Sequence, residues 1–116
     1  MSQTLLQYET VKDISRRFQV HKGTMREILG ISESTQARYE RKNAVLKPAI
    51  ADRLGRFQRI TQQALELFED ETETQRWLSS AKDGLNGQTP LEALATDAGS
   101  KQVEELLYRA EYGIFG

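Results

Sequence analysis

Apolar side chains recur at spacings of three and four along most of this 116-residue chain, which is the spacing of an amphipathic helix. Only two prolines occur, and no stretch alternates apolar and polar residues as a half-buried strand does. The longest run follows Pro48, where a proline is tolerated in the first turn of a helix. Its members are spaced alternately by four and three residues, a pattern that repeats every seven positions: Ile50, Leu54, Phe57, Thr61, Ala64 and Phe68. We predict an all-α protein in which a long helix from Pro48 packs on both halves.

The composition excludes several kinds of chemistry. The chain contains no cysteine, and its single histidine, His21, cannot build a zinc site by itself. There is no serine-nucleophile motif and no phosphate-binding loop. Residues 1–10 lack the features of a signal peptide, and no apolar run approaches the roughly 18 residues of a membrane span. We therefore expect a cytoplasmic protein with no cofactor, metal or membrane partner, and not an enzyme.

Charge is divided unevenly along the chain. Residues 1–60 carry 12 Lys and Arg against 6 Asp and Glu, a net charge of +6. Residues 61–116 carry 4 Lys and Arg against 11 Asp and Glu, a net charge of −7. This division predicts two surfaces with two partners, one of them anionic. It is equally compatible with two solvated faces that attract each other.

The basic half is predicted to contain three short helices before the long one. Apolar spacing places them at about residues 11–18, 24–29 and 33–43. Gly30 suits the left-handed position that ends a helix, and Ser32 is a good N-cap for the next one.

The turn around Gly30 gives these helices the pattern of a helix-turn-helix, whose second helix enters the major groove of DNA. Basic side chains neutralise phosphates, and polar ones hydrogen-bond to base edges. We expect Ala37 to pack inward because it is small. The candidate base contacts are Ser34, Thr35, Gln36, Arg38 and Tyr39, and the candidate phosphate contacts are Lys22, Arg26, Arg41 and Lys42.

Two alternatives remain open for the basic half. An earlier register would pair residues 14–18 with a helix over 22–29 and bring His21, Lys22, Thr24 and Arg26 to the DNA. The later register is preferred because its second helix carries more polar side chains able to read bases. The other alternative is a helical bundle whose basic face is merely solvated.

The acidic half shows three further helix starts. Thr72 with Gln75 is predicted to form a capping box, and residues 81–88 are predicted to be a loop. Thr89-Pro90-Leu91-Glu92 combines an N-cap, a first-turn proline and a capping-box glutamate. Thr96 is predicted to begin the last helix, and Gly113 to end it.

The end of the chain is the predicted partner surface of this half. The apolar pair Ile114 and Phe115 follows the last helix and has no periodic partner in the chain, which favours contact with another molecule. Trp77, Leu78 and Leu91 are expected in the core. The expected contact residues are Tyr108, Arg109, Glu111, Tyr112, Ile114 and Phe115.

Short motifs in the acidic half carry a family resemblance. They include Arg76-Trp77-Leu78, Gly87-Gln-Thr-Pro-Leu-Glu, Thr96-Asp-Ala-Gly and Glu111-Tyr-Gly-Ile-Phe-Gly. In order, spacing and terminal position they resemble the toxin-binding domain of the Xre/MbcA/ParS antitoxins. More loosely, Leu29-Gly-Ile-Ser with Thr35 and Arg38 resembles the Xre helix-turn-helix. One departure is Tyr39-Glu40, where Xre recognition helices often have consecutive basic residues.

The resemblance implies a type II antitoxin with two domains, over residues 1–60 and 61–116. Such proteins bind a RES-domain toxin that destroys NAD and block its active site. They usually form homodimers that bind operator DNA and repress their own operon. In this family the terminal motif lies at the toxin interface, which adds Gly113 to the expected toxin-contact residues. Two other functions remain open: a transcriptional regulator whose C-terminal half only dimerises, and an interaction protein whose N-terminal half oligomerises.

Overall fold

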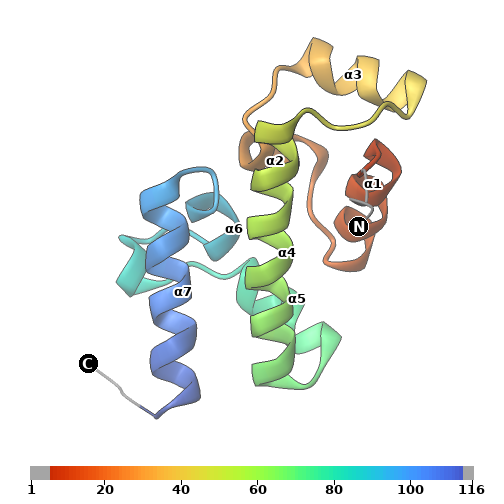
Figure 1. Ribbon diagram of the computed structural model, residues 1–116. Helices are drawn as coiled ribbons and strands as arrows, with labels where there is room; N and C mark the ends of the chain where they lie inside the picture. The colour runs from red at the N-terminus through yellow and green to blue at the C-terminus, as the bar shows by residue number, and fades with distance from the viewer. Residues whose placement is uncertain (1–5, 114–116) are drawn as a thin grey trace.

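The computed structural model describes residues 6–113, which form seven α-helices and one short 3-10 helix (Figure 1). Their bounds are α1 Tyr8–Arg17, α2 Lys22–Leu29, α3 Glu33–Lys42, α4 Pro48–Phe68, α5 Glu71–Leu78, η1 Asp83–Leu85, α6 Pro90–Ala93 and α7 Asp97–Glu111. An isolated bridge between Gln7 and Val45 is the only β pairing in this part of the chain. The all-α prediction is confirmed. Within residues 6–113, no helix has the combined length and apolar character needed to cross a bilayer.

The first three helices follow the predicted order, and the turn between α2 and α3 has the predicted chemistry. Gly30 lies in the left-handed region with φ 68°, and the Ser32 hydroxyl accepts a hydrogen bond from the Thr35 amide at 3.1 Å. The first helix begins at Tyr8, three residues before the predicted start. The cause is tertiary, because the Tyr8 ring is buried and stacks on the Tyr39 ring at 5.7 Å between centroids.

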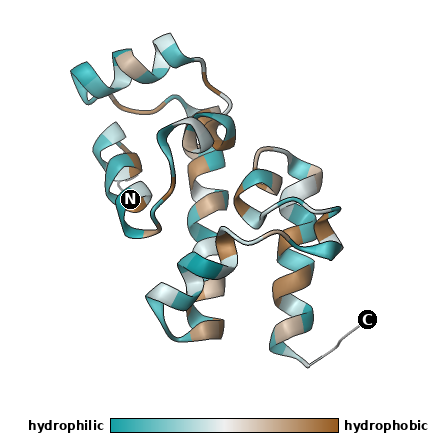
Figure 2. Cartoon of the chain, turned by 180° about the vertical axis from the view of Figure 1, so that it is seen from behind, coloured by the Kyte–Doolittle hydropathy of each residue, from teal (hydrophilic) through white to brown (hydrophobic). Residues whose placement is uncertain are grey.

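Helix α4 runs through the middle of the molecule and joins its two halves (Figure 1). It contacts α2 on the N-terminal side and both α5 and α7 on the C-terminal side. Leu54, Phe57 and Ile60 are fully buried, and hydrophobic bands recur along α4 and α7 in Figure 2. Thr61, the polar member of the seven-residue pattern, donates its hydroxyl to the Phe57 carbonyl at 2.9 Å. One core therefore serves both halves, and α4 packs on both as predicted.

The acidic half confirms two predicted helix starts and corrects one. Thr89 and Glu92 form the predicted capping box of α6, and the Thr96 hydroxyl accepts from the Gly99 amide at the start of α7. The N-cap of α5 is Asp70, whose carboxylate accepts from the Glu73 amide at 2.8 Å. The capping box predicted at Thr72 was wrong, since the N-cap residue lies two positions earlier and its carboxylate takes the first-turn amide of Glu73.

A close contact between α6 and α7 depends on Gly99. A β-carbon at this position would lie 2.8 Å from the Ala93 carbonyl carbon and 2.9 Å from the Thr96 hydroxyl oxygen, and closer still to the Ala93 carbonyl oxygen. Real β-carbons essentially never come within 3.0 Å of such atoms. Only glycine allows the first turn of α7 to approach the α6 backbone this closely.

Candidate interaction surfaces

The outer face of α3 is an exposed basic surface of the N-terminal half. Ser34, Ala37, Arg38 and Arg41 are all exposed, and their spacing places them on one side of the helix. Helix α3 itself lies at one end of the molecule, away from α7 (Figure 1). Among the expected DNA contacts, the structure therefore brings Ser34, Arg38 and Arg41 together on one face, with Lys42 exposed beside them.

Two expected base contacts lie inside the protein. Gln36 is 1% exposed and Tyr39 is 7% exposed, so neither side chain belongs to the outer face of α3. The Tyr39 hydroxyl accepts a hydrogen bond from the Lys47 amide at 3.3 Å. The opposite error concerns Ala37, which was expected to pack inward and is exposed instead. The inner side of α3 thus consists of long polar and aromatic residues, and an alanine occupies its outer face.

Helix α2 supplies two more of the expected cations. The Lys22 ammonium lies 2.9 Å from the Glu40 carboxylate, and this contact raises the pKa of Lys22. Arg26 is half-buried and donates to the side-chain oxygen of Gln36 at 3.0 Å. His21 is the N-cap residue of α2, and its side chain makes no cap hydrogen bond. Through these contacts with Glu40 and Gln36, both Lys22 and Arg26 lie where α2 packs against α3.

The carboxyl end of α7 carries an exposed aromatic pair at the opposite end of the molecule from α3. Tyr108 and Tyr112 are 52% and 62% exposed, and their ring centroids are 4.6 Å apart. Arg109 pairs with Glu105 at 2.7 Å, and Glu111 and Gly113 are exposed. A groove of about 250 Å³ lies beside this face, lined by Gly84, Gln102, Glu105, Leu106 and Arg109. Of the expected toxin contacts, Ile114 and Phe115 lie outside the described residues.

The remaining motif residues of this half have structural roles. Leu78, Pro90 and Leu91 are buried, and Trp77 is half-buried against the Phe68 ring at 5.8 Å between centroids. The Lys82 ammonium lies 5.1 Å from the Trp77 ring centroid, and burial lowers the pKa of Lys82. The expectation that Trp77, Leu78 and Leu91 are core residues is confirmed, with Trp77 at its edge.

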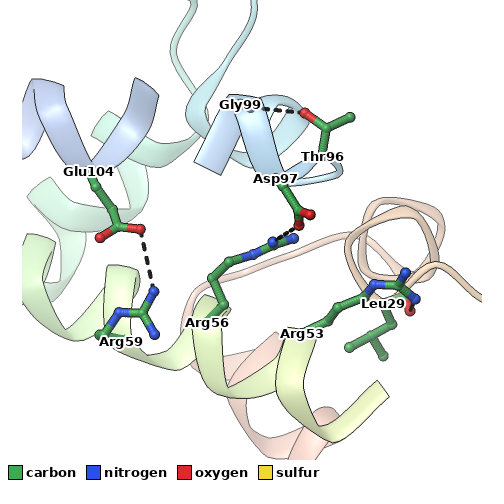
Figure 3. Close-up of polar contacts among 8 residues, drawn as sticks. All are labelled: Leu29, Arg53, Arg56, Arg59, Thr96, Asp97, Gly99 and Glu104. Carbon is green, nitrogen blue, oxygen red and sulfur yellow. Dashed lines mark hydrogen bonds and ion pairs between the residues drawn. The ribbon is translucent and has the colours of Figure 1, made fainter. Parts of the chain in front are cut away.

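Three arginines on one side of α4 connect the two halves (Figure 3). Arg53 donates to the Leu29 carbonyl at 3.1 Å and so caps the last turn of α2. Arg56 pairs with Asp97 at the start of α7, and Arg59 lies 3.4 Å from Glu104. This α4 arginine stripe was not predicted, because its partners are 24 to 45 residues away in sequence.

The Arg56–Asp97 pair makes a pH-dependent contribution to stability. The hydrogen bond and charge of Arg56 hold the pKa of Asp97 below its ordinary value of 3.8. A lowered carboxyl pKa stabilises the fold above the unfolded-state value, and that stabilisation disappears as pH falls through the folded-state value. We expect Asp97→Asn to unfold at a lower temperature than wild type at neutral pH, and the difference should vanish once pH falls below the lowered folded-state pKa of Asp97. Melting curves across pH would test this, and a pH-independent difference would contradict it.

Comparison with known proteins identifies one known domain in each half of the chain. Residues 5–59 match the model of the antitoxin Xre-like helix-turn-helix domain, and residues 63–113 match that of the antitoxin Xre/MbcA/ParS C-terminal toxin-binding domain. Two proteins named antitoxin Xre are similar to the chain. The one from Pseudomonas putida is 40% identical over 63 residues, which are 54% of this chain and 40% of that protein. The one from Yersinia enterocolitica is 30% identical over 87 residues, which are 74% of this chain and 59% of that protein.

The two matched regions meet inside α4, the helix shared by both halves. Together they include the α2–α3 turn, the Thr89 and Thr96 caps and the exposed aromatic pair of α7. The chain spans about 40% and 59% of the lengths of these two relatives. With a helix-turn-helix domain followed by a toxin-binding domain, this chain belongs to the family of Xre-type antitoxins.

Proposed function

We propose that this protein is an antitoxin that binds a RES-domain, NAD-degrading toxin and blocks its active site. The observation that carries the proposal is the exposed aromatic pair, Tyr108 and Tyr112, at the end of the toxin-binding domain. Large exposed aromatic side chains are costly in water and are typical anchors of protein interfaces. Among the described residues, the only other large hydrophobic side chain with such exposure is Val45, in the N-terminal half.

Charge supports the same assignment. The half of the chain that contains α7 has a net charge of −7, and Glu111 is exposed beside the aromatic pair. A RES-domain enzyme must attract NAD, which is anionic, so its active-site entrance should be basic. An acidic surface with aromatic anchors complements such an entrance, and that complementarity speeds association and rejects wrong partners.

The second part of the proposal is repression of the protein's own operon. The basic outer face of α3 would enter the major groove, with Ser34, Arg38 and Arg41 near base edges. The phosphate contacts would come from Lys22, Arg26 and Lys42. A phosphate of the DNA backbone requires positive charge but no hydrogen-bond pattern specific to a base. Gln36 and Tyr39 are left out because they are buried. Binding as a cytoplasmic homodimer would match the two half-sites of an operator.

The toxin part is tested with a RES-domain toxin from the same operon. We expect the purified protein to stop NAD consumption once it reaches the toxin's concentration. Changing Tyr108 and Tyr112 together to alanine should weaken toxin binding about 30-fold or more, because the loss of even one aromatic anchor costs about 2 kcal/mol. The fold should be unaffected, since both rings are exposed.

Val45→Ala is the matched control, because it also removes an exposed apolar side chain but lies in the other half of the chain. It should leave toxin binding unchanged. Continued NAD consumption with excess wild-type protein would rule out the antitoxin function. That result would favour the alternative function, a transcriptional regulator whose C-terminal half only dimerises.

A further inference from the structure

Gln36 is a buried amide between the two helices of the helix-turn-helix. It is 1% exposed, and both ends of its side chain are hydrogen-bonded to α2. The amide oxygen accepts from the Arg26 guanidinium at 3.0 Å, and the amide nitrogen donates to the Lys22 carbonyl at 3.1 Å. The Gln36 side chain is therefore hydrogen-bonded both to the first turn of α2, through the Lys22 carbonyl, and to Arg26 one turn later.

Stability alone gives little reason for an amide at this position. The net contribution of each of its hydrogen bonds to stability is small. What the amide provides here is geometry. Arg26 has five N–H donors in a rigid fork, and Gln36 takes one of them. This hydrogen bond restrains the guanidinium and leaves donors for another acceptor.

The two cations of α2, Lys22 and Arg26, differ in their charge partners. Lys22 forms an ion pair with the Glu40 carboxylate at 2.9 Å. Arg26 makes no ion pair among the described residues, and the group that holds it is a neutral amide. Gln36 therefore fixes the guanidinium without cancelling its charge, which a carboxylate at the same position would do. An oriented guanidinium with full charge is suited to bidentate contact with a phosphate.

We propose that Gln36 is a positioning residue for DNA binding: it holds Arg26 of α2 as a preorganised, uncompensated contact to a backbone phosphate. The proposal rests on the proposed DNA-binding function and deepens it. Phosphate contacts carry no sequence information, so the effect extends to any duplex. It also explains how a residue inside the protein can affect affinity for a ligand that it does not touch.

The test is a titration of a short mixed-sequence DNA duplex at several salt concentrations. Gln36→Met keeps the length of the side chain and removes both hydrogen bonds. We expect it to weaken binding about tenfold and to reduce the salt slope by about 0.9, the value for one lost phosphate contact. Arg26→Ala should have the same two effects. In the double variant, Gln36→Met should add nothing to the effect of Arg26→Ala, because both remove one contact.

A merely structural role for Gln36 would give a different result. Gln36→Met would then lower the melting temperature, leave the salt slope unchanged and add to the effect of Arg26→Ala. An unchanged salt slope, or an effect that adds to that of Arg26→Ala, would overturn the proposal. Gln36→Asn is the second variant, because it keeps a buried amide that is too short to reach both partners. If it binds DNA like wild type with the same salt slope, the proposal is also overturned. Wild-type protein that binds no duplex at low salt would instead overturn the DNA-binding function on which it rests.

Discussion

Gly99→Ala is expected to destabilise this protein by about 3 kcal/mol, at the upper end of the cost of overpacking. The new methyl group would overlap the Ala93 carbonyl, which belongs to the backbone of α6 and cannot rotate away. Relief requires α7 to move from α6, and α7 also carries the exposed aromatic pair. A thermal melt should show a midpoint lower by about 10 °C, at about 4 °C for each kcal/mol in a domain of this size.

Gly55→Ala is the matched control for this prediction. Gly55 also lies inside a helix, but a β-carbon there would meet nothing within 4 Å. Alanine favours the helical conformation over glycine by about 1 kcal/mol, so this variant should melt a few degrees higher than wild type. Replacing glycine by alanine would thus lower the stability at position 99 and raise it at position 55. Equal melting temperatures for the two variants would contradict the assignment of a close α6–α7 contact.

Changing Arg38 and Arg41 together to alanine is expected to weaken binding to the promoter region of the protein's own operon about 100-fold. Both side chains lie on the outer face of α3, and removing one base contact costs about 1–3 kcal/mol. The fold should persist, because both residues are exposed. Fluorescence anisotropy with a labelled promoter fragment would measure the loss.

Arg76→Ala is the control for α3, since it removes an exposed arginine from α5. It should change promoter affinity by less than about twofold, because a single distant charge is screened at physiological salt. If the α3 variant binds as tightly as this control, the outer face of α3 does not contact DNA. The earlier helix-turn-helix register, with His21 and Thr24, would then be the alternative to examine.

Local signals made much of the fold predictable. The left-handed Gly30, the Ser32 cap and the Thr89 and Thr96 caps each act over three or four residues, so their chemistry is visible in the sequence. The apolar pattern after Pro48 predicted a helix over the length that α4 has. The caps depend on hydrogen bonding to the backbone within one turn, which distant residues seldom override.

Features that depend on distant residues could not be predicted in the same way. The inner side of α3 contains Gln36 and Tyr39, whose partners are on α2, on α1 and before α4. Judged by side-chain polarity alone, Gln36 and Tyr39 are predicted to be exposed and Ala37 to be buried. Burial of a polar residue requires a partner for each hydrogen-bonding group, and only the assembled fold shows whether those partners exist.

The candidate sites follow the same division. An aromatic and charged stretch after the apolar stripe of α7 predicted exposed contact residues, and Tyr108 and Tyr112 are exposed. Their contact with a toxin stays a prediction. The α4 arginine stripe left no local signal, because arginines at spacings of three are compatible with a solvated helix face. Only the neighbouring α2 and α7 turn it into a connection between the two halves (Figure 3).

We propose that opposite ends of one folded unit bind two different partners. The most direct test measures both affinities, for promoter DNA and for the RES-domain toxin, in two variants: Arg38→Ala with Arg41→Ala, and Tyr108→Ala with Tyr112→Ala. We expect each variant to lose at least about tenfold, or about 1.4 kcal/mol, for one partner and to bind the other like wild type. Variants that lose both partners together, or a wild-type protein that binds neither, would contradict the claim.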